Sequence, residues 1–254
     1  MIAGKKLFVS VLTYDLHRRL GDAAAAAFLE QVQSPSRTSL PCARVVARLA
    51  AMTELQLYHG ASSCLPKARS RAADAAWRAA PDYWIMLDDD VEAPTATIAD
   101  LITIAGRPSQ ARIAVLPCLL RGQKDSEHKL NCEFSGPSRL NVEAAAWVRP
   151  VKYAGCGMVV VTRHALELLV GKYTPGLRFT DDDGIDRLAL FQMLLDDTQG
   201  DERQPPRRSW LGEDFSFFRR AELAGVELVG LVQGISQHAG QGLELDSLRD
   251  IVGA

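Results

Sequence analysis

The chain has 254 residues, 47% hydrophobic and 24% charged, a globular composition that excludes disordered, collagen-like and coiled-coil proteins. Its 29 lysine and arginine residues against 31 aspartate and glutamate residues give a formal net charge of -2. No overall positive field is therefore present to hold nucleic acid unspecifically. This length suits a single large domain, and we expect one over residues 1–254.

The cysteines and the N-terminal segment indicate where the protein resides. None of the five cysteines forms a Cys-x-x-Cys pair, which favours reduced thiols. The apolar stretch at residues 7–12 is too short for the core of a signal peptide or for a membrane span. We therefore expect a cytoplasmic protein that has no membrane anchor.

Strand-like and helix-like segments alternate through the first half of the chain. Strands are predicted at residues 7–12, 54–58, 83–87 and 112–116. Helices are predicted at residues 21–33, 42–52, 66–78 and 94–105, with a loop at 34–41. The alternation predicts an α/β fold in which helices cover a mainly parallel central sheet.

The second half of the sequence is less regular. The polar segment 122–143 is compatible with a hairpin or a flap. Strands are predicted at 158–162 and 226–232, and helices at 163–170 and 213–223. The segment from Asp196 to Ser209 is rich in Asp, Gln, Pro and Arg, which predicts a mobile loop.

Three aspartates, Asp88, Asp89 and Asp90, directly follow the apolar strand at 83–87. In parallel α/β sheets, ligands bind beyond the carboxyl ends of the strands. Carboxylates crowded at such a point repel one another, and bound Mg²⁺ or Mn²⁺ would stabilise them together with substrate phosphates. A solvated acidic turn that caps the next helix is the alternative, and we favour the metal site.

An acidic pair and a late histidine are further candidates. Glu213 and Asp214 follow Gly212 at the start of a predicted helix, where the helix dipole alone would favour them. The functional interpretation is a general base held on a rigid helix start. His238 would complete a mixed nitrogen and oxygen metal site if the fold brings it back to Asp90, although a lone histidine is more often structural.

Two other motifs are weaker. Lys67 and Arg71 share one face of a predicted helix and Arg69 lies off it. Guanidinium groups near a strand end suit phosphate or carboxylate recognition, and a solvated helix face is the alternative. Gly155 and Gly157 precede a strand and permit close approach of the backbone to a ligand, and a plain turn explains them equally well.

The order of these motifs is more specific than any one of them, and it resembles that of inverting glycosyltransferases with the GT-A fold. The resemblance covers residues 7 to 240, except that 121–147 contains no matching motif. The matching motifs are Val9 to Tyr14, Pro66 to Arg71, Asp88-x-Asp90, Gly155-x-Gly157 followed by Arg163, Gly212-Glu213-Asp214 and His238-x-Gly240. Within the superfamily the chain looks most similar to small phage- and prophage-encoded transferases, some of which glycosylate modified bases in phage DNA.

The resemblance implies a Rossmann-like, three-layer fold. It implies a nucleotide-sugar-binding half at about 1–118 and an acceptor and catalytic half at about 145–254. It also implies a nucleotide-sugar donor, with UDP-sugar favoured, and Mn²⁺ or Mg²⁺ as cofactor. Metal at the donor diphosphate would neutralise its charge as the glycosidic bond breaks.

Roles for individual residues follow from the same resemblance. Thr13 and Tyr14 would contact the base and ribose, Arg69 the nucleotide or its phosphates, and Asp88, with Asp89 beside it, the ribose or the sugar. Asp90 and His238 would bind the metal, and Gly155 and Gly157 would line the acceptor side. Asp214 would be the general base, with Glu213 as the second carboxylate of the catalytic pair.

The favoured acceptor is a hydroxymethylated pyrimidine in DNA, with a polysaccharide or other glycan as the alternative. The arginines proposed to contact DNA phosphates are Arg203, Arg207, Arg208, Arg219 and Arg220. Two other functional classes remain open. One is a non-catalytic nucleotide-sugar-binding module. The other is a nucleotidyltransferase, which would normally carry a glycine-rich loop where this chain has Thr13 to Arg19.

Overall fold

The computed structural model describes residues 4–13, 41–61, 64–89, 91–93, 95–118, 130–198, 207–232 and 237–238. The helices are α2 (Pro41–Met52), α3 (Leu65–Ala79), α4 (Thr95–Ala105), α5 (Arg163–Tyr173) and α6 (Glu213–Leu223). The strands of the central sheet are β1 (Leu7–Thr13), β2 (Leu55–Ala61), β3 (Tyr83–Asp88), β5 (Arg112–Val115), β6 (Cys132–Phe134), β7 (Arg139–Asn141), β8 (Ala146–Ala154), β9 (Met158–Thr162) and β14 (Glu227–Leu231). Shorter pairs are β4 (Val91–Glu92) with β15 (Gln237–His238), β10 (Arg178–Thr180) with β11 (Asp186–Leu188), and β12 (Leu194–Thr198) with β13 (Arg207–Leu211).

The central sheet has nine strands in the order β2-β1-β3-β9-β5-β14-β8-β6, with β7 also paired to β8. The pairs β2–β1, β1–β3 and β5–β14 are parallel, whereas β9 is antiparallel to both of its neighbours. Strand β8 is antiparallel to β14, β6 and β7. All strands of this sheet except β8 and β9 therefore run in one direction, which confirms the expected α/β fold with a mainly parallel sheet.

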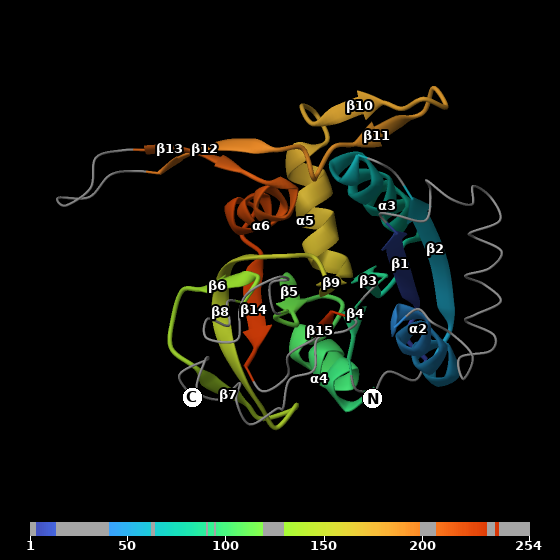
Figure 1. Ribbon diagram of the computed structural model, residues 1–254, viewed down its shortest axis with the longest axis vertical. Helices are drawn as coiled ribbons and strands as arrows, with labels where there is room; N and C mark the ends of the chain where they lie inside the picture. Colours follow the sequence, from blue (N-terminus) through green and yellow to red (C-terminus); the bar gives the residue numbers. More distant parts are fainter. Residues whose placement is uncertain are drawn as a thin grey trace.

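Helices cover both faces of the sheet because its strands are apolar on both sides (Figure 1). On β3, Trp84 and Met86 point into a core shared with α3, α5 and α6. The alternate residues Ile85 and Leu87 point into a second core shared with α2 and α4. Since side chains alternate along a strand, Asp88 at the end of β3 continues the Trp84 and Met86 row and faces α3 and α6.

Most predicted elements agree with the structure. The predicted segments 158–162 and 213–223 match β9 and α6 at both ends. The other strands and helices predicted within the described residues begin and end within a few residues of the observed elements. The helix predicted at 21–33 and the loop at 34–41, up to residue 40, lie outside the described residues. The five cysteines form no disulfide, as expected.

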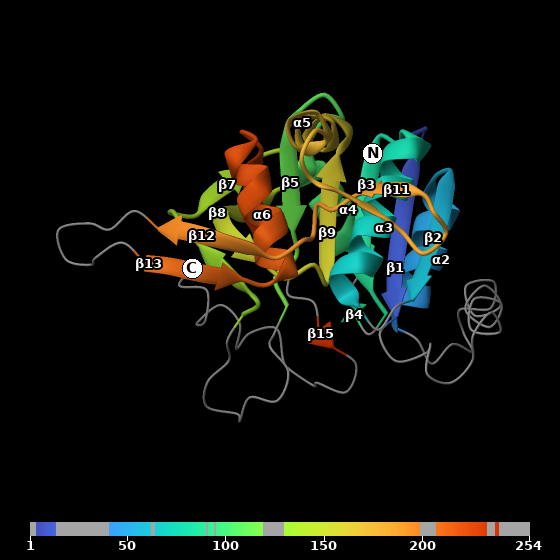
Figure 2. The same ribbon diagram turned by 90° about the horizontal axis from the view of Figure 1, so that it is seen from above.

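The polar segments of the second half contain more strand than the sequence predicted. The prediction of a loop at 196–209 is wrong at both ends of the segment, where the structure has strands. Strands β12 and β13 pair there, from Leu194 opposite Leu211 to Thr198 opposite Arg207. The hairpin extends sideways from the body of the protein (Figure 2). The hairpin β10–β11 and the long strand β8 were not predicted, and β6 and β7 make the polar 122–143 segment partly a β-structure.

The described helices include none that is both long enough and apolar enough to cross a membrane.

Candidate functional site

The carboxyl ends of β1, β2 and β3 meet at one edge of the sheet. Thr13 is in register with Ala61, and Leu12 is in register with Asp88. The turn after β3 is fixed there, because the Asp89 backbone N–H donates to the Leu12 carbonyl at 3.2 Å. The Asp88 N–H donates to the carbonyl of Gly157 at 3.0 Å, which brings the start of β9 to the same edge. This edge is where an α/β sheet binds its ligands.

Arg69 joins two carboxylates that come from distant parts of the chain. Its guanidinium Nη1 lies 3.2 Å from Asp88 Oδ1, and its Nε lies 3.0 Å from Asp214 Oδ1. The side chain is only 3% exposed, so it is enclosed in protein rather than open to solvent. Burial opposes the charged form, but the carboxylates of Asp214 and Asp88 together raise the pKa of Arg69 above its usual value.

The predicted contact of Arg69 with the nucleotide or its phosphates stays a prediction. Among the described residues its charge is directed at Asp88 and Asp214, and Nε and Asp214 Oδ1 are buried and not aligned for a hydrogen bond. The positive charge of Arg69 therefore holds the two carboxylates near each other. We interpret Arg69 as the residue that links Asp88, at the end of β3, to Asp214, at the start of α6.

Asp214 lies in the first turn of α6, where Gly212 is the N-cap and provides no side-chain cap. Its Oδ2 accepts a hydrogen bond from the Cys156 N–H at 3.2 Å. The neighbouring thiol is buried, and burial together with the charge of Asp214 raises the pKa of Cys156, which keeps the thiol protonated. Asp214 is 21% exposed despite these contacts, so it is both held and accessible.

Glu213 is the second carboxylate of the pair and is half-buried beside Asp214. Burial, and then the negative charge of Asp214, raise the pKa of Glu213 above its usual value. Arg69 and Asp88 also act on this carboxyl, which indicates that it faces the same cluster. The two carboxyl groups therefore have different environments. Asp214 is held by Arg69 and the Cys156 N–H, whereas Glu213 is half-buried beside it.

The two glycines next to Cys156 allow close contacts. A Cβ on Gly155 would lie 2.5 Å from the amide nitrogen of Asn131, and one on Gly157 would lie 3.3 Å from Val91. Asn131 accepts a hydrogen bond from the Gly155 N–H through its backbone carbonyl, and its side-chain Oδ1 accepts one from the Cys118 N–H at 2.8 Å. The glycines thus bring the loop that carries Cys156 against its neighbours, and Asn131 fixes that loop.

The expected metal ligands are only partly covered by the structure. Strand β15 pairs with β4, and His238 is in register with Val91, the residue that follows Asp90 in the sequence. The backbone of His238 therefore returns to the acidic turn, as the sequence hypothesis requires. Asp90 and the side chain of His238 lie outside the described residues. Within the described part of the chain, no three His, Cys, Asp or Glu side chains form a metal-binding group.

Thr13, Tyr14 and Asp89 are the other residues predicted to contact the nucleotide sugar. The backbone of Thr13 ends β1 at this edge, while its side chain and the whole of Tyr14 lie outside the described residues. Asp89 is half-buried in the turn after β3, and its carbonyl accepts a hydrogen bond from the Cys42 N–H at 3.4 Å.

Lys67 and Arg71 are directed away from the carboxylate cluster. Both bind Asp181 near the hairpin β10–β11, at 3.0 Å from Lys67 Nζ and 2.5 Å from Arg71 Nε. Arg187 binds the same carboxylate at 2.7 Å. Arg69 therefore pairs with different carboxylates from those of its two basic neighbours on α3.

The arginines expected to contact DNA phosphates have other partners. Arg220 is buried and donates to the carbonyls of Leu190 and Gln192, so that part of the prediction is wrong. Arg219 binds Asp196 and Glu222, and Arg208 binds Asp197. Arg203 and the side chain of Arg207 lie outside the described residues.

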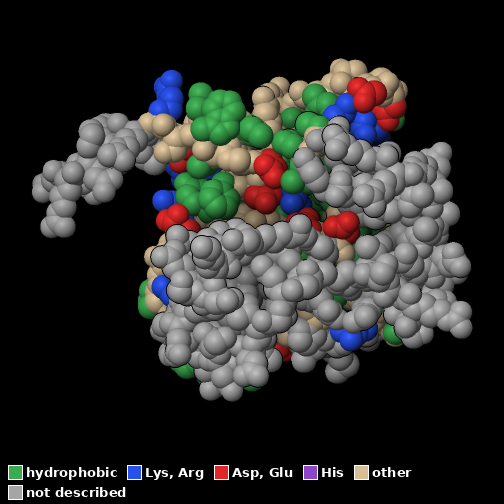
Figure 3. All heavy atoms as spheres, viewed as in Figure 1, with side chains coloured by type: hydrophobic (Ala, Val, Ile, Leu, Met, Phe, Trp, Pro, Cys, Tyr) green, Lys and Arg blue, Asp and Glu red, His purple; other side chains and the backbone are tan. Residues whose placement is uncertain are grey.

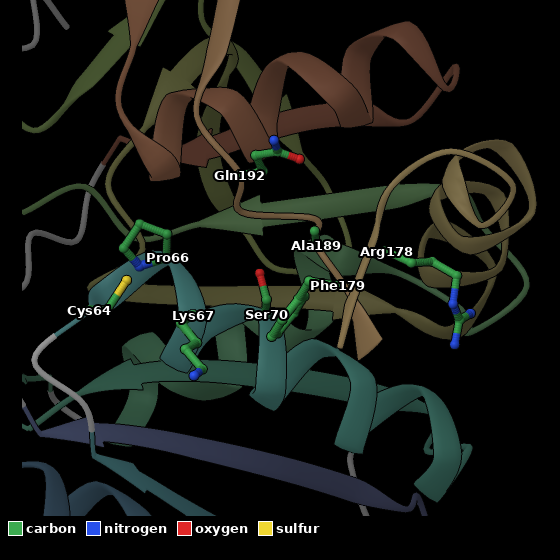
Figure 4. A pocket seen from close by; sticks show the side chains of 8 residues that line it. All are labelled: Cys64, Pro66, Lys67, Ser70, Arg178, Phe179, Ala189 and Gln192. Atoms are coloured by element: carbon green, nitrogen blue, oxygen red, sulfur yellow. The ribbon is translucent and has the colours of Figure 1, made fainter. Parts of the chain in front are cut away.

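A pocket of about 280 Å³ lies beside the first turns of α3 (Figure 4). It is lined by Cys64, Pro66, Lys67, Ser70, Arg178, Phe179, Ala189 and Gln192. Lys67 and Ser70 flank Arg69 in the sequence, but Arg69 itself does not line the pocket. The pocket is therefore a neighbour of the carboxylate cluster and not part of it.

Sequence reasoning missed the residues that support the cluster. Cys156 is only the middle residue of the Gly155-x-Gly157 motif, and Asn131 lies in the segment without a recognisable motif. Cys156 acts through its backbone N–H, and Asn131 acts through its backbone carbonyl and its side-chain amide. Contacts of this kind leave no pattern in the sequence. The Gly-Cys-Gly spacing was the available signal, because it marks a close backbone approach.

Comparisons with known proteins leave the function to be argued from this geometry. No family model matches the chain, and no curated protein matches it. Among solved structures, protein A197 from STIV has a TM-score of 0.44 at 13% identity, covering 95% of this chain and 87% of that one. GalNAc-T7 with UDP, GalNAc and Mn²⁺ has a TM-score of 0.45 at 12% identity, covering 97% of this chain and 48% of the other. Mannose-1-phosphate geranyltransferase from Thermus thermophilus has a TM-score of 0.30 at 15% identity, covering 67% and 61%.

Proposed function

We propose that the protein is a metal-dependent, inverting glycosyltransferase that moves a sugar from a nucleotide-sugar donor, with UDP-sugar favoured, to an acceptor hydroxyl. The observation that carries the proposal is the contact of buried Arg69 with both Asp88 and Asp214. It joins a carboxylate at the ligand-binding edge of the sheet to a carboxylate on a rigid helix start. Donor binding and proton removal need these two positions side by side.

The predicted metal ligands suit a divalent cation. The acidic turn supplies carboxylates, which suit Mn²⁺ or Mg²⁺. The β15–β4 pairing returns the backbone of His238 beside Val91, and an imidazole ligand there would favour Mn²⁺ over Mg²⁺. Asp90 and His238 would hold the ion. When bound, the ion supplies positive charge that stabilises a diphosphate leaving group.

The protein's own groups supply the rest of the reaction. Asp88 hydrogen-bonds the ribose or the sugar of the donor, while Arg69 limits the motion of the Asp88 side chain. Asp214, oriented by Arg69 and by the Cys156 N–H, takes the proton from the acceptor hydroxyl as that oxygen attacks the anomeric carbon. The sugar passes through an oxocarbenium-like state, and inversion needs no covalent enzyme intermediate.

The first experiment is calorimetry with a nucleoside diphosphate, with and without Mn²⁺. We expect affinity that depends on Mn²⁺ in the wild type and is largely lost in Asp90→Ala. Affinity that is the same in all four measurements would contradict the metal site. Hydrolysis of a panel of nucleotide sugars then separates an enzyme from a binding module and identifies the donor. Release of pyrophosphate from a nucleoside triphosphate and a sugar phosphate would instead indicate a nucleotidyltransferase.

The acceptor from the sequence hypothesis, hydroxymethylated DNA, belongs in the same screen beside glycans. The arginines invoked for it are weaker support now, because Arg220 is buried and Arg219 and Arg208 are ion-paired.

A further inference from the structure

The segment that carries Cys156 forms a closed ring of contacts with the carboxylate cluster. The Cys156 N–H donates to Asp214 Oδ2 at 3.2 Å. Arg69 contacts both Asp214 and Asp88. The Asp88 N–H donates at 3.0 Å to the carbonyl of Gly157, which is the neighbour of Cys156 in the chain. Asp214 is therefore connected to the end of β3 by two separate routes, one through Arg69 and one through Cys156.

The backbone of Cys156 is fixed on both sides. The Gly155 N–H donates to the Asn131 carbonyl at 2.7 Å, and a Cβ on Gly155 would lie 2.5 Å from the side-chain nitrogen of Asn131. On the other side, the carbonyl of Gly157 accepts the Asp88 N–H. Since the segment cannot move without breaking these hydrogen bonds, the Cys156 N–H keeps its direction toward the carboxylate that it binds.

The two carboxylate oxygens of Asp214 have different surroundings. Oδ1 is buried against Arg69 and has no hydrogen-bond partner among the described residues. Oδ2 accepts the Cys156 N–H and has a second lone pair for another donor. The Asp214 side chain is 21% exposed, so Oδ2 is the one of its two oxygens that can be accessible. On the face seen in Figure 3, acidic side chains reach the surface beside α6.

The thiol of Cys156 is a second donor to the same carboxylate, because the side chain also hydrogen-bonds Asp214. Burial, and then the negative charge of Asp214, raise the pKa of this thiol, so the sulfur keeps its proton and is a donor rather than a nucleophile. Cys156 is only 1% exposed, and water does not compete for the S–H group. In such surroundings even a weak donor restrains an ionised acceptor.

We propose that Cys156 is a positioning residue for the general base, and that its backbone N–H and its thiol orient Asp214 so that Oδ2 takes the proton of the acceptor hydroxyl. This inference rests on the proposed glycosyltransferase function and names the atom and the supporting residue of its proton transfer. Arg69 holds Oδ1 through its charge, which leaves Oδ2 in the direction that Cys156 sets.

The proton transfer is part of a balanced reaction. The acceptor oxygen forms a bond to the anomeric carbon of the donor, and the bond from that carbon to the diphosphate oxygen breaks. The nucleoside diphosphate leaves with the electron pair of the broken bond, and the acceptor proton goes to Asp214 Oδ2.

A purely structural role is the alternative, because buried cysteines commonly act as small apolar side chains. The two roles differ in what replaces the thiol. A structural Cys156 tolerates alanine, which is small and apolar, at least as well as serine. A positioning Cys156 needs a donor, which serine has and alanine lacks.

The first measurement detects the thiol contact without turnover. The infrared S–H stretching band of Cys156 is assigned by subtracting the spectrum of Cys156→Ala from that of the wild type, or that of Cys156→Ser if the alanine variant does not fold. A thiol that donates a stronger hydrogen bond has a lower S–H frequency. Because an amide is a weaker acceptor than a carboxylate, we expect the band to move to higher frequency in Asp214→Asn. The band of Cys132, a half-buried thiol on β6, should not move.

The second measurement is Mn²⁺-dependent hydrolysis of the donor found in the screen, with the full chain. In Cys156→Ala we expect kcat to fall about tenfold while the donor KM stays within about twofold. Cys156→Ser should keep at least about half of the wild-type kcat, because its hydroxyl group replaces the donor. Cys132→Ala is the matched control and should behave as the wild type, since Cys132 pairs with Ala154 at the edge of the sheet.

The outcomes separate the two proposals. An S–H band that does not respond to Asp214→Asn, a kcat of Cys156→Ala within about twofold of the wild type, or equal losses in the alanine and serine variants overturns the positioning role. Absence of Mn²⁺-dependent turnover in the wild type, with an S–H band that does respond, overturns the proposed function and with it the role of Asp214 as a base.

Discussion

Two ionic clusters share helix α3 and differ in how many cations contact each carboxylate. Around Arg69, one buried guanidinium contacts the carboxylates of Asp88 and Asp214, with Glu213 beside them. Two residues further on, Arg71 joins Lys67 and Arg187 around the single buried carboxylate of Asp181. In the first cluster one guanidinium serves two carboxylates, whereas in the second three cations contact the carboxylate of Asp181. The same three cations also contact three further carboxylates, those of Asp74, Asp182 and Asp183.

The difference separates a site from a structural joint. Asp181 has its charge fully compensated, and hydrogen bonds from Arg71, against the opposing effect of burial, hold its pKa well below the usual value. This joint fastens the hairpin β10–β11 to α3. The Arg69 cluster keeps excess negative charge at the ligand-binding edge, which a cation or a sugar hydroxyl group would complete.

The largest effect should come from the carboxylate that the site positions for proton transfer. Asp214→Asn keeps the shape of the side chain and removes its basicity, so we expect turnover to fall on the order of 10²–10⁴. Donor affinity should be nearly kept, which calorimetry measures. Asp197→Asn, on the exposed hairpin, is the control. Normal turnover in Asp214→Asn with none in Glu213→Gln would exchange their roles.

Removing the shared cation should unbalance the first cluster. In Arg69→Met, Asp88 and Asp214 lose their common partner, and we expect a loss of about 3 kcal/mol in the free energy of unfolding. Urea unfolding measures the loss. Arg208→Gln, which removes an ion pair whose side chains are 67% and 71% exposed, should cost less than about 0.5 kcal/mol. Equal losses in the two variants would show that Arg69 has no special role.

Breaking the second cluster should affect stability and spare catalysis. We expect Asp181→Asn to lower the free energy of unfolding by about 2 kcal/mol at neutral pH. Because the folded-state pKa of Asp181 is lowered, this contribution is complete above the unfolded value of about 4 and is lost as pH falls below it. Wild type and variant should therefore converge in acid. Asp182→Asn, at an 83% exposed side chain of the same hairpin, should have a smaller effect. Reduced turnover of folded Asp181→Asn would contradict a purely structural joint.

The sequence predicted the parts of the fold that follow apolar periodicity. An apolar run that ends in aspartates identified β3 and its acidic end, and a glycine before two acidic residues identified the start of α6. The alternation of strands and helices predicted the layers. These signals are local, because the residues that define each element are close in sequence.

Contacts between distant segments were beyond this reasoning. The sequence placed Arg69 off the face shared by Lys67 and Arg71, which is correct, but nothing local indicates that it is buried between Asp88 and Asp214. The hairpins β10–β11 and β12–β13 carry many charged residues, and a composition rule assigns such segments to loops. The hairpin β12–β13 buries inward residues such as Leu211, and Asp197 and Arg208 pair across it, which only the paired structure reveals.

The smallest effect is expected at the exposed ion pair of the β12–β13 hairpin, and it tests whether the acceptor carries phosphate groups. Arg208 and Asp197 are 67% and 71% exposed, so water screens their attraction, and Arg208→Gln should change the free energy of unfolding by less than about 0.5 kcal/mol. Since an acceptor without phosphate groups makes no use of a cation, the acceptor KM should also stay within about twofold, and its dependence on salt should not change. A phosphate-bearing acceptor would behave differently, because each lost phosphate contact weakens binding and lowers the salt dependence by about one unit of slope. Steady-state kinetics at two salt concentrations, in wild type and Arg208→Gln, distinguishes the two. A clear rise in KM that disappears at high salt would show that Arg208 leaves Asp197 to bind an anionic acceptor.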